Sequence, residues 1–367
     1  MAFPRPVSAD DIEALALGAW ILGTGGGGSP YCGLLNMRRL YREGIVVSLL
    51  DPDELADDDA VAVVSTMGAP LVGQERLADP APLEHAVRMM ETYVGRRFAA
   101  VMSVEIGGGN GLAPFLAAAR LGLPVVDADA MGRAFPEAQM TSVAIGGLQP
   151  YPCTLYDPRG IEAIVTKVPS WKWMERASRK ICVEMGSIAS TSKAPRTGRE
   201  VKDWGIHFTT TAAIRIGRLV REANRLHTDP IAALLESEGG KRLFTGKVVD
   251  VARRTTEGFL RGSVAIEGID DDRGSRLELS FQNEWIVAWR EGKAVAMSPD
   301  LICVLESVSG HAVGTETVRY GQRVTVVALP APAVLTSPRG LEFVGPRAFG
   351  YDLDFRSVFE ERAGAGV

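Results

Sequence analysis

Apolar positions near the N-terminus follow a helical period in two successive segments. Residues 9–22 form an approximate apolar stripe with acids in the first turn, and Ser8 precedes them as a candidate N-cap. Four consecutive glycines at 25–28 interrupt this pattern. After them, Ser29 and Pro30 fit the N-cap and N1 positions of a second helix. The pattern therefore predicts two helices joined by a glycine-rich loop.

Short apolar runs then alternate with segments that have a helical period. Continuous apolar runs of this length, separated by helices, are typical of a mainly parallel sheet that is covered by helices. The expected strands lie in residues 44–50, 60–66, 98–106 and 123–129, and helices are expected at 82–95 and 111–122.

From about Leu243 the text changes to alternating, β-rich segments punctuated by Gly, Asp and Pro. Such segments are typical of an antiparallel sheet or small barrel. They lie at 244–254, 258–269, 275–292 and 322–329. A helical stretch that closes on glycines at 239–240 makes a natural boundary. We therefore expect an α/β domain over 1–240 and a β-rich domain over 241–367, with the last segment packing back on the first domain.

Composition and charge narrow the class of protein. The 367 residues are 46% hydrophobic and 23% charged, and the formal net charge is −5. This balance lacks the basic footprint of a nucleic-acid partner. The apolar runs are shorter than the roughly 20 residues that span a bilayer, and the first residues do not resemble a signal peptide. The four cysteines form no CxxC pair, so reduced thiols are expected. We expect a cytoplasmic protein without a membrane partner.

The glycine run is the first candidate for chemistry. A dinucleotide-binding loop follows a strand, whereas this run follows a predicted helix, so it is a poor match to that class. Bare backbone N–H groups at a helix start can bind a carboxylate, a phosphate or a polarised carbonyl. On this interpretation Thr24, Gly25, Gly26, Gly27 and Gly28 contact the substrate. A tight turn, or close packing against another backbone, explains the glycines equally well.

A second glycine stretch, at residues 107–111, has the context that the first one lacks. It runs from a predicted strand into a predicted helix, which places Glu105 near the carboxyl end of the strand and Asn110 near the helix start. The next strand ends in Asp127 and Asp129. Ligands of open α/β sheets bind outside the carboxyl ends of the strands. We therefore predict that Glu105, Asp127 and Asp129 are catalytic and that Asn110 binds the substrate.

These carboxylates need something to balance their charge if they converge. Crowded carboxylates cannot all ionise without a cation, a shared proton or a basic partner such as Arg133. Arg133 and Glu137 follow on the same segment and are predicted to bind the substrate. A single aspartate after a strand is more commonly a helix cap or a solvated turn residue. We favour a site for the group as a whole, because perturbed carboxylates cluster at functional sites.

Two further features remain as alternatives. Cys32 lies close to a helix start, where its pKa could be lowered, but the sequence offers no partner base for a nucleophilic thiol. In the β-rich half, Gln282, Asn283 and Glu284 lie at a predicted strand end or turn. They could close over a ligand that is bound on the first domain.

Several blocks resemble one known family over nearly the whole chain. They are "LGTGGGGSPYCG", "EIGGGNGLAPFLAA", "LGLPVVDADAMGRAFPEAQM", "GKVVDVARRTTEGFLRG" and "RYGQRVTVVALPAP" with "GLEFVGPRAFGYD". They are similar to the S-methyl-thiohydantoin desulfurase-like family, which is associated with hydantoinase-type proteins. The resemblance implies a three-layer α/β domain followed by a β-barrel-like domain. It also implies hydrolysis of a five-membered hydantoin or thiohydantoin ring, with methanethiol displaced from an S-methylated substrate.

The chemistry of this reaction suits the predicted residues. Glu105 or Asp129 could take the proton of the attacking water, with help from a divalent metal such as zinc. Glycine N–H groups could stabilise developing negative charge, and Arg133 could bind a substrate carboxylate. Another hydrolase or isomerase of hydantoin-like rings remains an alternative, as does a non-catalytic partner of a hydantoinase-type enzyme. We also expect a homo-oligomer.

Overall fold

The first half of the chain builds a mixed eight-stranded sheet. The computed structural model describes residues 4–68, 72, 79–256 and 258–360. Four central strands, β2, β5, β4 and β3, are parallel, and antiparallel strands extend the sheet at both edges. In spatial order the strands are β1 (Arg5–Pro6), β2 (Ser48–Leu50), β5 (Val125–Val126), β4 (Ala100–Ser103), β3 (Ala60–Gly68), β9 (Ile188–Thr197), β7 (Cys153–Asp157) and β8 (Ile161–Val165).

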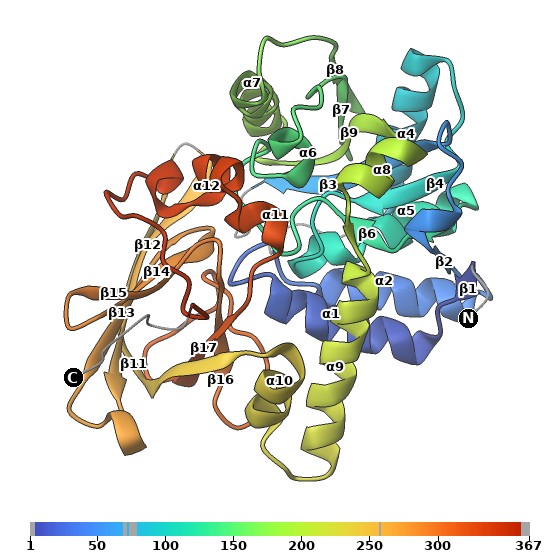
Figure 1. The fold of residues 1–367 in the computed structure, drawn as a ribbon. Helices are drawn as coiled ribbons and strands as arrows, with labels where there is room; N and C mark the ends of the chain where they lie inside the picture. The colour runs from blue at the N-terminus through green and yellow to red at the C-terminus, as the bar shows by residue number, and fades with distance from the viewer. Residues whose placement is uncertain (1–3, 69–71, 73–78, 257, 361–367) are drawn as a thin grey trace.

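Helices cover this sheet, as the alternating pattern predicts (Figure 1). In the first part of the chain these helices are α1 (Ala9–Leu22), α2 (Tyr31–Arg42), α4 (Ala81–Val94), α5 (Ala113–Leu121) and α6 (Ser142–Ile145). They are followed by α7 (Trp171–Glu184), α8 (Gly198–Trp204), α9 (Thr209–Arg225) and α10 (Pro230–Glu238). Ser8 caps α1 through a reciprocal capping box, as expected. Pro30, and not Ser29, is the N-cap of α2, so that helix begins one residue later than predicted. Among the described residues, no helix is long and apolar enough to cross a membrane.

The second half is an antiparallel sheet that curls into a half-barrel, which confirms the predicted fold class (Figure 1). Neighbouring strands along the sheet are β15 (Lys293–Met297), β14 (Glu284–Arg290), β13 (Arg276–Gln282), β12 (Phe259–Gly268), β11 (Lys241–Thr256), β17 (Arg323–Leu329) and β16 (Leu301–Glu306). After β17 the chain forms two short helices, α11 (Ala333–Thr336) and α12 (Pro338–Val344), which contact α6 of the first half. The two halves thus share packed surfaces.

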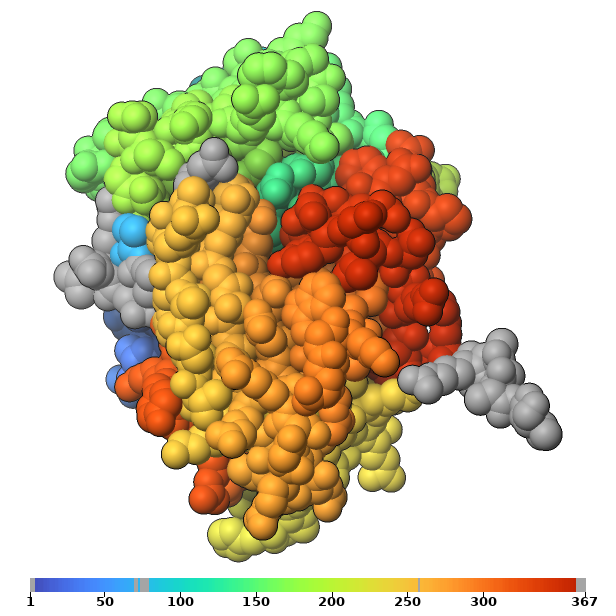
Figure 2. All heavy atoms as spheres, turned by 90° about the vertical axis from the view of Figure 1, so that its left-hand side faces the viewer, coloured from blue at the N-terminus to red at the C-terminus, as the bar shows by residue number. Residues whose placement is uncertain are grey.

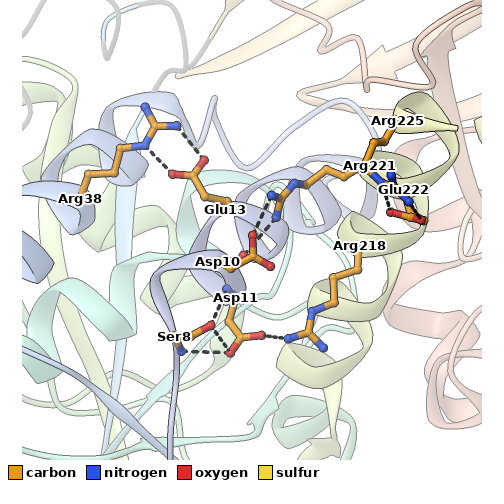
Figure 3. Close-up of polar contacts among 9 residues, drawn as sticks. All are labelled: Ser8, Asp10, Asp11, Glu13, Arg38, Arg218, Arg221, Glu222 and Arg225. Carbon is orange, nitrogen blue, oxygen red and sulfur yellow. Dashed lines mark hydrogen bonds and ion pairs between the residues drawn. The ribbon is translucent and has the colours of Figure 1, made fainter. Parts of the chain in front are cut away.

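Helices α1 and α9 approach so closely that each presents a glycine to the other. A Cβ on Gly18 would lie 1.8 Å from the carbonyl oxygen of Ala213, and a Cβ on Gly217 would lie 1.9 Å from that of Ala14. Ion pairs flank this contact on the surface (Figure 3). In one of them, Arg221 of α9 is 2.7 Å from Asp10 of α1. Exposed pairs of this kind contribute little stability, so close backbone packing dominates the contact.

Replacing the glycine at this contact should destabilise the fold. We expect Gly217→Ala to lower the free energy of unfolding by about 2–3 kcal/mol, because the clash outweighs the better helix propensity of alanine. Urea unfolding followed by circular dichroism measures this loss. Gly33→Ala in α2 is the matched control, since the nearest atoms to its Cβ would be side-chain atoms of Leu112 and Leu116, none closer than 3.3 Å. Equal midpoints for the two variants would contradict this account of the helix contact.

Candidate functional site

The two glycine-rich loops pack against each other. The carbonyl oxygens of Gly27 and Gly28 accept hydrogen bonds from the N–H of Gly109, at 3.0 and 2.8 Å. A Cβ on Gly27 would lie 2.3 Å from the carbonyl oxygen of Gly107. Backbone packing, the alternative explanation of the glycine run, therefore accounts for this part of it.

Residues from the second half of the chain also pack against the glycine run. A Cβ on Gly25 would lie 2.4 Å from the indole nitrogen of Trp285, and one on Gly26 would lie 2.0 Å from Oε1 of Glu284. The N–H of Trp285 donates to the carbonyl oxygen of Thr24 at 2.8 Å. Gly28 differs from these residues, because it has a φ of +76° and a Cβ added to it would meet no atom within 4 Å. Other parts of the protein thus pack closely against Gly25, Gly26 and Gly27, whereas Gly28 faces open space.

A cavity of about 600 Å³ lies beside these loops, between the two halves. Gly27, Gly28 and Gly109 contribute backbone to its wall, and Glu284 contributes a side chain from the second half. In the space-filling view, the segment that contains α7 lies directly above the C-terminal sheet (Figure 2). Arg179 of α7 stacks on the Phe259 ring of β12, 4.6 Å from its centroid, where these two parts meet.

Glu105 is held at the cavity wall by two hydrogen bonds. It follows the carboxyl end of β4, as predicted, and is 6% exposed. Its Oε1 accepts from Nδ2 of Asn110 at 2.5 Å, and its Oε2 accepts from the N–H of Phe135 at 3.1 Å. Asn110 also lines the cavity, and its Oδ1 accepts from the N–H of Thr66 at 2.8 Å. Burial raises the pKa of Glu105 to about 7, although these hydrogen bonds and the charges of Lys193 and Arg179 oppose the shift.

Glu284 brings a second buried carboxyl group to the same cavity. It opens β14 and is 2% exposed, and its Oε2 has no hydrogen-bond partner among the described residues. Burial raises its pKa well above the usual range, and the nearby charge of Glu105 adds to that rise. Arg133 acts in the opposite direction. Two interacting carboxyl groups with raised pKa values therefore face one cavity, an arrangement that can hold one proton near neutral pH.

Asp127 and Asp129 lie outside the cavity lining. Asp129 is fully buried, and its Oδ2 accepts from the N–H groups of Ile106 at 2.7 Å and Gly132 at 2.8 Å. Burial raises its pKa to about 7. Oδ1 of Asp127 accepts from the N–H of Thr211 in the first turn of α9 at 3.1 Å. Of the three predicted carboxylates, only Glu105 lines the cavity, because backbone amides of a turn and of a helix start bind Asp129 and Asp127; their catalytic roles stay predictions.

Arg133 does not face the cavity either. Its guanidinium is fully buried and joins the two halves of the chain. Nη2 donates to Oγ1 of Thr24 at 2.7 Å, and Nη1 donates to the carbonyl oxygens of Pro299 and Asp300, both at 3.1 Å. Burial lowers its pKa to about 10. Arg133 is therefore not among the residues that line the cavity, and Thr24, whose Oγ1 accepts from Arg133, is equally buried; the predicted contacts of both residues with a substrate stay predictions.

The remaining predicted residue, Glu137, lines the cavity. Its Oε1 accepts from Nε2 of Gln282 at 3.2 Å, and its Oε2 accepts from Nε2 of Gln139 at 2.6 Å. Gln282 belongs to β13, so this contact also crosses between the halves. Residues 282–284 therefore contact the first half of the chain, and closure over a bound ligand stays a hypothesis.

Three basic residues of the cavity wall escape the sequence analysis. Lys193, Arg196 and Arg179 all line the cavity. The first two lie on β9, whose polar sequence gives no apolar run, and Arg179 lies on α7. The sequence does signal a basic, tryptophan-containing segment at 169–180, which includes Arg179, but it gives no sign that this segment reaches a cavity.

The structure also locates the cysteines and the possible metal ligands. Cys32 is exposed and lines the cavity, whereas Cys153, Cys182 and Cys303 are buried. Within the described ranges, no group of three or more His, Cys, Asp or Glu side chains is arranged to hold a metal ion.

Comparisons with known proteins agree with this architecture. A crystal structure of a protein from Chromobacterium violaceum superimposes with a TM-score of 0.81 at 24% sequence identity, covering 97% of this chain and 100% of that one, which shows a shared fold. A search of curated proteins finds no match. Residues 10–167 match the model of the S-Me-THD-like N-terminal domain, and residues 169–358 match that of the S-Me-THD-like C-terminal domain. The chain belongs to the S-Me-THD-like family.

Proposed function

We propose that this protein is a hydrolase of a hydantoin-like five-membered ring and that it displaces methanethiol from an S-methyl-thiohydantoin. The family is thiohydantoin-related. The observation that carries the proposal is the pair of buried carboxyl groups, Glu105 and Glu284, that faces one cavity between the halves. Two carboxyl groups with separated proton affinities can divide the roles of general base and general acid.

The reaction balances with water as the only co-reactant. Ionised Glu105 takes one proton from water while the hydroxyl oxygen bonds to ring carbon 2, and protonated Glu284 gives its proton to the adjacent ring nitrogen. In the tetrahedral intermediate, the hydroxyl proton returns to Glu284 as the carbonyl forms. The carbon–sulfur bond breaks, and the sulfur takes the proton held by Glu105. Methanethiol and the hydantoin leave, and both carboxyl groups regain their starting states.

The proposal is tested by thiol release from an S-methyl-thiohydantoin that carries a propionate side chain. The purified protein is analysed for metal content, and the reaction is run in ¹⁸O water. We expect stoichiometric methanethiol and hydantoin, with the label in the new carbonyl group. The absence of release above a heat-inactivated sample, from folded protein and at any metal content, would contradict the proposed hydrolase. Stable association with a hydantoinase-type enzyme would then favour the partner role.

The activity should depend on pH in a predictable direction. Glu105 acts when ionised, so kcat/KM should rise as the pH increases through about 7. Glu284 acts when protonated, and its pKa is raised well above normal, so kcat/KM should fall at higher pH. In Glu284→Gln we expect kcat to fall about 10- to 100-fold and the alkaline decline to disappear. A bell-shaped profile that persists in this variant would assign the alkaline limb to another group.

A further inference from the structure

The charges on the cavity wall are unevenly distributed. The carboxyl groups of Glu105 and Glu284 lie beside the glycine loops, whereas Lys193 and Arg196 come from β9 on the other side of β3. Lys193 pairs in register with Val63 of β3, and Val63 pairs with Met102 of β4. Its strand is therefore two strand spacings, about 10 Å, from the strand that leads to Glu105.

The basic side chains differ in whether their charge is already satisfied. Nε of Arg179 is 2.7 Å from Oε1 of Glu175, which neutralises it. Arg196 is 3% exposed, and its Nη2 donates to the carbonyl oxygen of Gln149 at 2.8 Å. Lys193 is half-buried at the cavity wall, and its side chain makes no hydrogen bond or ion pair with any described residue. The charge of Glu105 acts on it from a distance, but no described carboxylate lies within ion-pair distance of the ammonium group, which leaves its hydrogen-bond donors open to a ligand.

We infer that Lys193 determines substrate specificity by binding an anionic substituent of the ring. This inference rests on the proposed function for the placement of the ring beside Glu105 and Glu284. A ring in that position directs a short acidic side chain across β3 toward Lys193, and the long lysine side chain covers the rest of the distance between the two strands. Carboxylate hydrogen bonds to an ammonium group are among the stronger polar contacts. Lys193 would thus supply the positive charge for a substrate carboxylate that the sequence analysis expected from Arg133.

Two substrates that differ only in the charge of the side chain test this inference. One is the S-methyl-thiohydantoin with a propionate side chain, and the other carries the neutral propionamide. We expect Lys193→Met to raise KM for the propionate about 10- to 100-fold and to change KM for the propionamide less than about threefold. Lys193→Arg should restore most of the preference, because it restores the positive charge. Lys202→Met is the matched control, since Lys202 lies on α8 outside the cavity lining and pairs with Asp57.

A binding measurement separates this inference from the proposed reaction. Calorimetry with hydantoin-5-propionate and its amide reports recognition of the side chain without turnover. Tighter binding of the propionate by the wild-type protein, lost in Lys193→Met, supports the role of Lys193 even if no thiol is released. Equal losses for both substrates or both hydantoins would overturn the assignment. Thiol release without any preference for the anion would leave the hydrolase standing and remove Lys193 from recognition.

Discussion

Glu105→Gln is expected to lower kcat for thiol release by about 10²–10⁴-fold, which is the usual contribution of a general base. The reason is geometric as well as chemical. Asn110 and the N–H of Phe135 hold both carboxylate oxygens at the cavity wall, and burial brings the pKa of this group to about 7. A glutamine keeps the shape but cannot accept a proton from water. Steady-state kinetics of the purified variant measure the loss.

Controls separate lost chemistry from lost structure in this variant. The glutamine amide would direct its NH₂ group toward one of two hydrogen-bond donors, so the melting temperature must be measured beside the rate. Glu105→Asp keeps the charge but withdraws it by one methylene, and its activity should lie between those of the wild type and the amide. Glu84→Gln is the matched control, because Glu84 forms a surface ion pair with Arg120 away from the cavity lining. If Glu105→Gln retained the wild-type kcat, Glu105 would not be the base.

Apolar periodicity predicted the elements that carry regular apolar runs and failed where polar residues are buried in the sheet. The parallel strands and strands β11, β12, β13, β14 and β17 of the C-terminal sheet were predicted because their runs read directly as strands, whereas β15 and β16 were not among the expected segments. Strand β9 was not, because its sequence, IASTSKAPRT, is rich in Ser and Thr and contains Pro195. Inside the sheet its polar groups find local partners. Oγ1 of Thr191, for example, donates to the carbonyl oxygen of Ser65 at 3.0 Å.

The candidate site was predictable at the level of the strand end, but the sequence could not specify the direction of each side chain. Glu105 and Asn110 lie beside the cavity, as expected for residues that follow a parallel strand. Asp127 and Asp129 come from the neighbouring strand, but their carboxylates accept hydrogen bonds from backbone amides of α9 and of the following turn. Glu284 arrives from a strand in the second half of the chain, so its pairing with Glu105 depends on how the two halves dock. That docking is a tertiary property which local pattern does not encode.

The sequence predicts that Arg133 binds the substrate, whereas in the structure its guanidinium links the two halves of the chain. Its removal should therefore lower the free energy of unfolding substantially. It donates to groups on both halves, including Thr24, Pro299 and Asp300. Arg133→Met would leave these buried acceptors without donors, at about 1–3 kcal/mol for each unsatisfied group. Because burial of the charge also carries a cost, visible in the lowered pKa of Arg133, we expect a net loss of roughly 3 kcal/mol.

For a chain of 367 residues, whose entropy of unfolding is about 0.8 kcal/mol/K, such a loss corresponds to a fall in melting temperature of about 4 °C, measurable by calorimetry. Arg347→Met is the matched control, since Arg347 pairs with Asp352 and Asp354 on the surface and should change stability by less than about 1 kcal/mol. Arg133→Lys should recover part of the loss, because it keeps the charge but not the spread of guanidinium donors. Equal effects of Arg133→Met and Arg347→Met would mean that the two halves dock without this guanidinium. The position of Glu284 opposite Glu105 would then depend on the other contacts between the halves, including the packing of Trp285 and Glu284 against Gly25 and Gly26 and the hydrogen bond from Gln282 to Glu137.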